Sequence, residues 1–282
     1  MINIGVRAHD FGKMEAPELS DRIGKFGFSS IQLALKKAIA GFDEDHGRLS
    51  PGLGNYFRDS FARNRIDISV LGCYINPVHP DRLEREKAIS RFKEHLLFSR
   101  DFGCAIVGTE TGSPNPDCSF TEDIYKEETF QDFIAALKVL VAAAEKTGAI
   151  VAIEGVADKH TIHSHERMKR TLELIPSPNL GVIYDPVNFL PAAQSGESDR
   201  LMEEAFELFA HKMVAIHAKD FKMDDGIKNG TLPAGQGELN YHLLFDLIRH
   251  YKPWIHVLLE NNRPETLRES LRFLDSVKED LK

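Results

Sequence analysis

The chain alternates eight times between short, mostly apolar runs and longer amphipathic segments. The apolar runs are rich in β-branched residues and carry few polar positions on either face, which is typical of strands buried in a parallel sheet. They begin at Ile2, Phe28, Asp67, Cys104, Ala149, Leu180, Met213 and Trp254. We therefore expect eight buried parallel strands.

A 3.6-residue periodicity predicts a helix after each strand. Ser164 and Asn240 stand at the expected N-caps of two helices, and Gly103 and Gly148 stand where two others should end. The expected helices cover residues 16–26, 50–64, 81–102, 126–147, 164–175, 196–211, 240–250 and 264–281.

Eight strand–helix units in 282 residues match the size of a (β/α)₈ TIM barrel, which is typically about 250 residues. The alternative is an open, doubly wound sheet, but no GxGxxG or P-loop sequence follows any of the strands. The chain also has no linker-like or low-complexity stretch. We therefore expect an α/β TIM barrel that forms a single domain over residues 1–282.

Composition narrows the classes of partner. The formal net charge is −8, which gives no electrostatic reason to bind nucleic acid or an anionic membrane, although a local basic patch is compatible with it. No signal peptide or membrane-spanning run is evident. The three cysteines form no CxxC pair, as expected for reduced thiols in the cytoplasm. We expect a cytoplasmic protein with a small-molecule substrate, and the sequence leaves open whether it forms a homo-oligomer.

Four consecutive strands end in residues that can bind a metal: Glu154, Asp185, His217 and Glu260. The C-terminal ends of the strands form the mouth of a TIM barrel, where active sites lie. Each residue alone is more often a helix cap, a loop ion pair or a core histidine. Three carboxylates in one low-dielectric mouth repel, so either a cation neutralises them or some of them stay protonated.

A cation in this position would have three carboxylates and one imidazole as ligands. Such an oxygen-rich set suits Mn²⁺, Mg²⁺ or Co²⁺, and Zn²⁺ is also compatible. Four protein ligands on a six-coordinate ion leave two positions for neighbouring substrate oxygens.

Lys219 and Asp220 follow His217 at the end of the seventh strand. Side chains alternate along a strand, so Lys219 should point the same way as His217 and Asp220 the other way. We expect Lys219 to contact the substrate and Asp220 to support the site. The alternative for Lys219 is an ordinary loop ion pair.

Other polar residues near strand ends are weaker candidates for substrate binding. Asn188 follows Asp185 by three positions, Glu110 lies between glycine-containing segments, and His9 comes just after the first strand. Asn188 could hydrogen-bond a substrate oxygen, Glu110 could bind substrate or merely cap a loop, and His9 is the weakest of the three. Gln32 and Asn76 also lie at or just past strand ends.

Two further features follow strands five and seven. His160, His163 and His165 have a spacing that resembles a metal-binding box, but Ser164 indicates that a helix begins there, so the histidines can simply flank a cap. Residues 222–238 form an unusually long connection, which we interpret either as a loop that closes over ligand or as a solvated turn.

The stretches "VAIEGV", "GVIYDPVNF", "AIHAKDF" and "VLLEN" on strands five to eight resemble the xylose isomerase-like barrels. The similarity is greatest to the sugar phosphate isomerase/epimerase branch, and "GTETGS" and "LPAGQGELN" also resemble it. The resemblance implies that Glu154, Asp185, His217 and Glu260 ligate one divalent metal.

The resemblance also implies a reaction on a sugar, sugar acid, cyclitol or one of their phosphates. Glu154 and Glu260 would move the proton of an isomerase or epimerase through a metal-stabilised enediolate. The chemistry is consistent with this, since a carbon acid beside a ketone needs a base on one face, an acid on the other and an electrophile at the oxygen.

Three features depart from the family pattern. Asn188 replaces a histidine of many relatives, which argues against the three-zinc apurinic endonucleases. Gln32 replaces a glutamate on strand two. Lys219 and Lys222 are the basic residues near the metal histidine, where some ketose epimerases carry an arginine. The alternatives are a dehydratase of an inosose-like substrate, an apurinic endonuclease and a catalytically silent binding barrel.

Overall fold

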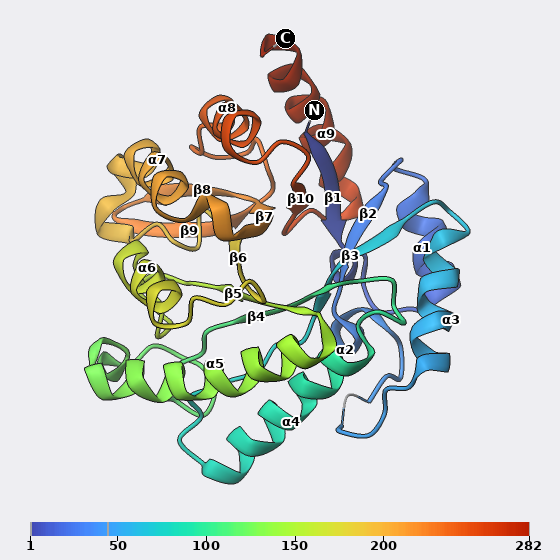
Figure 1. Ribbon diagram of the computed structural model, residues 1–282. Helices are drawn as coiled ribbons and strands as arrows, with labels where there is room; N and C mark the ends of the chain where they lie inside the picture. Colours follow the sequence, from blue (N-terminus) through green and yellow to red (C-terminus); the bar gives the residue numbers. More distant parts are fainter. Residues whose placement is uncertain (1, 44, 282) are drawn as a thin grey trace.

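Eight parallel strands close into a barrel in a computed structural model of the protein, which describes residues 2–43 and 45–281 (Figure 1). The strands follow one another around the barrel in the order β1-β10-β7-β6-β5-β4-β3-β2. The predicted TIM barrel is thus confirmed. The barrel strands are β1 (Asn3–Arg7), β2 (Ser30–Leu33), β3 (Asp67–Gly72), β4 (Ile106–Glu110), β5 (Ile150–Glu154), β6 (Leu180–Tyr184), β7 (Met213–Ala218) and β10 (His256–Leu259).

Long helices surround the strands (Figure 1). Four of them begin at a side-chain cap: the Ser50, Asp81, Ser164 and Asn240 side chains each accept a hydrogen bond from a backbone N–H of the first turn. The helices are α1 (Ala16–Gly24), α3 (Pro51–Ala62), α4 (Arg82–Phe98), α5 (Glu127–Thr147), α6 (His165–Leu174), α7 (Ser198–Phe209), α8 (Tyr241–Tyr251) and α9 (Pro264–Asp280).

A layer of apolar side chains fills the barrel interior and determines which residues reach the mouth. The layer contains Val70, Ala152, Ile183, Ala215 and Leu258. Side chains two positions apart on a strand share a face. The residues two positions after the last four of these are the four strand-end residues singled out above, so the register of the core layer directs all four toward the barrel axis.

The structure differs from the sequence prediction at residues 220–232. We expected a long loop after the seventh strand, but the chain forms an antiparallel hairpin of β8 (Asp220–Asp224) and β9 (Ile227–Leu232). The turn between them has positive φ at Asp225 (46°) and Gly226 (80°). Two consecutive positive φ angles produce the twist that a two-residue hairpin needs. In the hairpin, β9 contacts the short 3₁₀ helix Ala192–Glu197 that precedes α7 (Figure 1).

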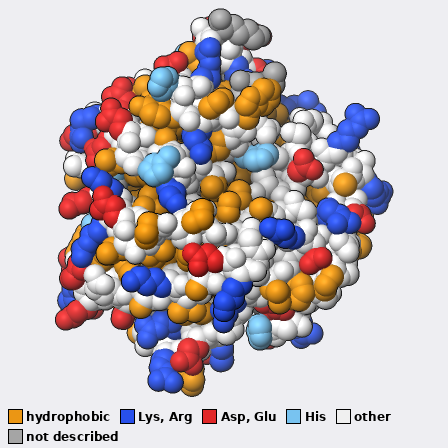
Figure 2. Space-filling model, viewed as in Figure 1, with side chains coloured by type: hydrophobic (Ala, Val, Ile, Leu, Met, Phe, Trp, Pro, Cys, Tyr) orange, Lys and Arg blue, Asp and Glu red, His pale blue; other side chains and the backbone are white. Residues whose placement is uncertain are grey.

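A short helix, α2 (Leu35–Ala38), follows β2 and was also not predicted. No helix in the described part of the chain is long and apolar enough to cross a bilayer. Figure 2 shows lysine and arginine side chains interspersed with acidic ones over the face in view.

Candidate metal centre and active site

Glu154, Asp185, His217 and Glu260 come together at the barrel mouth. One potential ligand atom from each lies within 4.8 Å of those of the other three. All four side chains are buried. Glu154 ends β5, and the other three lie at or just after the ends of β6, β7 and β10, so four adjacent strands supply the cluster.

His217 is the centre of the cluster. Its Nδ1 lies 3.2 Å from Glu154 Oε1 and 3.2 Å from Glu260 Oε2. Its Nε2 lies 2.6 Å from Gln32 Oε1, and the Gln32 amide donates to the Tyr74 hydroxyl at 2.8 Å. Burial lowers the pKa of His217, but the two glutamates outweigh it and raise the pKa to about 10. In the metal-free protein the imidazole is therefore protonated on both nitrogens and positively charged at neutral pH.

Lys219 extends into the same cluster. Its Nζ donates to Asn188 Oδ1 at 2.7 Å and to Glu260 Oε1 at 2.9 Å, and it lies 3.1 Å from Asp185 Oδ2. Burial lowers the pKa of Lys219, but Asp185 and Glu260 outweigh it, so the net pKa is raised. The side chain is thus a permanent cation beside two carboxylates.

Glu260 is the most strongly paired carboxylate. It pairs with Lys219 and His217, and it also forms an ion pair with Arg7, whose Nη1 lies 2.8 Å from Glu260 Oε1. Burial would raise the pKa of Glu260, but these three cations hold it well below its usual value. Glu260 is therefore ionised at neutral pH.

The two oxygens of Asp185 have different partners, since one accepts backbone hydrogen bonds and the other lies beside the Lys219 ammonium. Its Oδ1 accepts from the N–H groups of Val187 (2.8 Å) and Asn188 (2.9 Å). Its buried Oδ2 accepts no hydrogen bond from any residue that the structure describes. Burial raises the pKa of Asp185 despite the nearby Lys219. The Oδ2 atom pairs with the Lys219 ammonium, 3.1 Å away, and it lies in a cluster with two other carboxylates and an imidazole, a donor set that fits a divalent cation.

Asn188 connects the cluster to Lys219. Its Nδ2 donates to Glu154 Oε1 at 2.7 Å, and its Oδ1 accepts from Lys219. Both bonds orient side chains within the site.

Asp220 points away from the cluster and holds the chain that follows β9. Its Oδ1 accepts from the N–H groups of Phe221 and Leu239, both at 2.9 Å, and its Oδ2 accepts from Gly235 at 3.0 Å. The Tyr241 hydroxyl donates to the Lys219 carbonyl at 2.9 Å. Together these bonds fix the segment that carries Lys219.

The two remaining candidates belong to β4 and to the turn after β1, the strands that flank the cluster on its two sides. Glu110 pairs in register with Glu154 across β4 and β5. His9 lies in a short 3₁₀ turn after β1 and lines a cavity of about 560 Å³ with Asp10 and Asn261. Burial, together with nearby cations, lowers the pKa of His9 to about 3.

Sequence reasoning missed three residues of the mouth: Arg7, Tyr74 and Lys37. Arg7 ends β1, Tyr74 follows β3, and the Lys37 ammonium lies 3.6 Å above the centre of the Tyr74 ring. Arg7 could have been found, since it ends its strand as Glu154 does. Tyr74 resembles an ordinary apolar residue, and Lys37 lies in the unpredicted helix α2.

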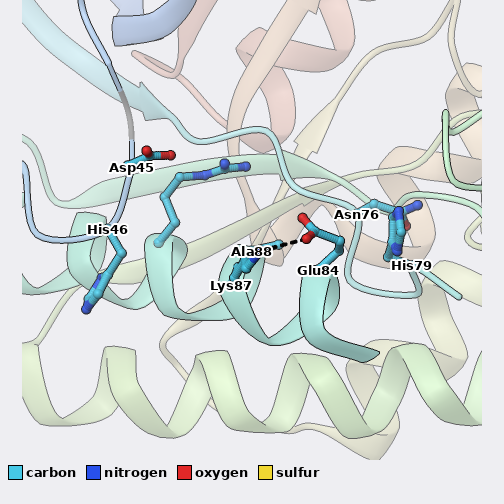
Figure 3. Close-up of a pocket in the computed structure, with 8 residues that line it drawn as sticks. Asp45, His46, Asn76, His79, Glu84, Lys87 and Ala88 are labelled. Atoms are coloured by element: carbon cyan, nitrogen blue, oxygen red, sulfur yellow. Dashed lines mark hydrogen bonds and ion pairs between the residues drawn. The ribbon is translucent and has the colours of Figure 1, made fainter. Parts of the chain in front are cut away.

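A separate polar pocket of about 490 Å³ lies outside the β3–α4 connection (Figure 3). Lys87 and Glu84 of α4 form an ion pair there at 2.7 Å. Asn76, at the edge of this pocket, donates to the carbonyls of Ser113 (2.8 Å) and Asn115 (3.1 Å). Asn76 thus ties two connections together.

Comparisons with known proteins identify the barrel type. A family model described as xylose isomerase-like TIM barrel matches residues 21–277. The sequence has no significant match among curated proteins. Similar solved structures include an IOLI protein with a bound zinc atom (17% identity, TM-score 0.75, covering 99% of this chain and 97% of the other).

Two further similar structures cover almost the full length of both chains. One is the 3-keto-D-glucoside 4-epimerase YcjR from E. coli (16% identity, TM-score 0.73, 98% and 100% covered). The other is a D-tagatose 3-epimerase-like protein (16% identity, TM-score 0.72, 98% and 99% covered). At these identities the likeness shows the fold.

Proposed function

The chain belongs to the xylose isomerase-like TIM-barrel family, and from this premise we propose that it is a divalent-metal-dependent isomerase or epimerase of a carbohydrate or cyclitol. The observation that carries the proposal is the buried cluster, in which two glutamates approach the same imidazole nitrogen at 3.2 Å. The epimerase and the zinc-containing protein among the structural relatives support the choice of reaction and of cofactor.

Glu154, Asp185, His217 and Glu260 would hold the metal. When bound, it would stabilise negative charge on an oxygen next to the carbon that loses its proton. The convergence of one potential ligand atom from each residue within 4.8 Å supports this assignment. Mn²⁺, Mg²⁺ and Co²⁺ suit the oxygen-rich set, and the zinc relative makes Zn²⁺ a further choice.

The two glutamates would transfer the proton. Glu154 and Glu260 belong to strands that are separated in the barrel by β6 and β7, so they approach a ligand on the axis from different sides. Asn188 fixes the Glu154 carboxylate through one hydrogen bond. One glutamate would remove a proton beside the carbonyl and the other would return one to the opposite face.

Arg7 and Lys219 would balance the charge that develops. With a divalent ion and a neutral imidazole, these two cations leave the site with one positive charge in excess of its three carboxylates. A single negative charge on the reacting substrate would neutralise that excess. Lys219 is a proposed substrate contact for this reason, and Asn188 is another because it lies between Lys219 and Glu154. Glu110 and His9 would contact the substrate on the two sides of the metal cluster.

Metal analysis combined with solvent-deuterium exchange tests the proposal. The purified protein should contain or bind one divalent ion, and deuterium should enter one ketose or inosose of a panel at a carbon beside the carbonyl. Glu154→Gln and Glu260→Gln should each reduce exchange by about 100-fold or more, as expected for loss of a general acid or base. Loss of water from the substrate in the same assay would identify a dehydratase instead.

Glu173→Gln, on the exposed face of α6, is the matched control and should exchange like the parent. Full exchange by Glu154→Gln with metal bound would disprove the assigned role. A protein that binds no divalent ion would disprove the metal site.

A further inference from the structure

The connection between β5 and α6 is held firmly against the end of β4. Thr161 donates to the Gly112 carbonyl twice, from its backbone N–H at 2.8 Å and from its hydroxyl at 3.0 Å. The Ile162 N–H donates to the Thr111 hydroxyl at 3.2 Å. These three bonds fix the position of the preceding residue, His160.

His160 is buried without a hydrogen-bond partner. Its side chain is 1% exposed, and neither Nδ1 nor Nε2 makes a hydrogen bond to any residue within 2–43 or 45–281. Its Nε2 lies 3.6 Å from Glu110 Oε2, slightly beyond hydrogen-bond distance. Buried polar groups in native proteins are almost always paired, so an unpaired imidazole that faces a carboxylate calls for a functional explanation.

Glu110 connects this histidine to the active site. Because Glu110 and Glu154 are in register on neighbouring parallel strands, their side chains project on the same side, about 4.8 Å apart at the backbone. The Glu110 side chain is 37% exposed. A ligand at the metal cluster would therefore meet Glu110, with His160 behind it.

The other two histidines of this segment have different surroundings. His163 packs against the Tyr125 ring, with 4.8 Å between centroids. His165 lies among aromatic side chains, with its Nδ1 3.8 Å from Glu204 on α7. The three histidines therefore do not form one metal site, and only His160 faces the barrel mouth through Glu110.

We propose that Glu110 and His160 form a hydroxyl-recognition pair, in which Glu110 accepts a hydrogen bond from a hydroxyl group of a polyhydroxylated ligand and His160 Nε2–H holds the carboxylate in place. The inference rests on the proposed function and assigns its ligand a hydroxyl on the side of the mouth formed by β4. His160 is a positioning residue, because it acts through Glu110. A small movement of the carboxylate closes the 3.6 Å gap into a hydrogen bond.

The charge state of the imidazole agrees with this role. Burial and the nearby Lys159 lower the pKa of His160 to about 4, although Glu154 opposes the shift. At neutral pH the ring is uncharged and carries one N–H group. It can therefore donate one hydrogen bond to the carboxylate without neutralising it.

Ligand binding to the Zn²⁺-loaded protein tests the pair. Calorimetry measures the binding of D-fructose, myo-inositol, an inosose and the deoxy forms of D-fructose. The histidine ring nitrogens are followed by ¹⁵N NMR. A polyol that binds should move the His160 Nε2 resonance. Glu110→Ala and His160→Leu should each weaken its binding by about 10- to 100-fold, the range for a hydrogen bond to a charged group.

Three comparisons separate positioning from a merely structural role. His160→Gln places an amide N–H near the position of Nε2 and should restore binding to within about threefold of the parent. The Glu110→Ala/His160→Leu double variant should bind no more weakly than Glu110→Ala alone, since coupled residues are non-additive. His163→Leu is the control and should bind like the parent. For a ligand that turns over, KM should rise while kcat changes little.

Any of three results would overturn the inference: losses of binding free energy that add in the double variant, a His160→Gln variant that binds the polyol as weakly as His160→Leu, or a His160 resonance that does not move on binding. If His160→Leu does not fold, Glu110→Ala still tests the pair. In that variant the polyol must no longer move the His160 resonance. Polyol binding that moves His160 without deuterium exchange would contradict the proposed reaction alone. Exchange with an unmoved His160 would contradict the pair alone, and no binding by any polyol would overturn both.

Discussion

Replacing Lys219 with methionine removes a buried ammonium group while keeping a side chain of similar length. Lys219 Nζ lies 2.9 Å from Glu260 and 3.1 Å from Asp185. In the metal-free cluster three carboxylates face three cations, Arg7, Lys219 and protonated His217. The substitution therefore leaves one carboxylate charge without a counterion in a buried position.

The expected magnitude follows from these distances. At about 3 Å and an effective dielectric constant of about 20, each ion pair contributes an attraction of about 5 kcal/mol before desolvation is counted. Breaking a buried pair by removing one partner costs about 3–5 kcal/mol. We expect Lys219→Met to lower the free energy of unfolding of the metal-free protein by that amount. With a divalent ion bound, the metal supplies the missing positive charge, so the loss should be less than half as large.

Urea unfolding with a chelator and with saturating Mn²⁺ measures both values. The matched control is Lys222→Met, because Lys222 is exposed and lies three residues further along the same segment. It should change stability by less than about 0.5 kcal/mol in either condition. An equal loss for Lys219→Met with and without metal would show that the ammonium does not balance the charge of the cluster.

Three further predictions concern the hairpin and the metal ligands. Asp220→Ala removes the acceptor of three backbone N–H groups and should cost about 2–4 kcal/mol in urea unfolding; an unchanged midpoint would contradict the bracing role. The Lys228 ammonium on β9 donates hydrogen bonds to the carbonyls of Val187 (3.0 Å) and Leu190. Lys228→Met should therefore speed amide hydrogen exchange over residues 220–232. Unaltered exchange would mean that other contacts hold the hairpin. Although burial lowers it, the pKa of His217 is raised to about 10 by its glutamate neighbours. The imidazolium proton must leave before a metal binds, so metal affinity should rise about tenfold per pH unit between roughly pH 6 and 9. Calorimetry in buffers of different ionisation enthalpy should detect about one released proton, and a pH-independent affinity would contradict the prediction.

The barrel and the four clustered residues could be predicted because both depend on local pattern. Buried strands and amphipathic helices have distinct periodicities, and the alternation of the two defines a TIM barrel. Once the barrel is assumed, the ends of its strands converge. Glu154 and Glu260 could therefore be placed together although they are far apart in the sequence.

The rest of the site depends on contacts that no local pattern reveals. Arg7 approaches Glu260 because β1 pairs with β10, and Tyr74 reaches Gln32 because β3 pairs with β2. The β8–β9 hairpin was missed for a different reason. Its Asp225–Gly226 turn is a recognised hairpin signal, but the flanking residues alternate too weakly in hydrophobicity to resemble strands.

Arg7 belongs to the first strand of the barrel and Glu260 follows the last, and their ion pair spans the seam at which the barrel closes. During synthesis the chain emerges from its N-terminus, so Arg7 is exposed long before its partner exists. Glu154, Asp185 and His217 can assemble while the seam is open, but Glu260, the fourth residue of the cluster, arrives only when β10 docks between β7 and β1. Assembly of the complete centre and closure of the barrel are therefore the same event, and a partly made chain lacks both.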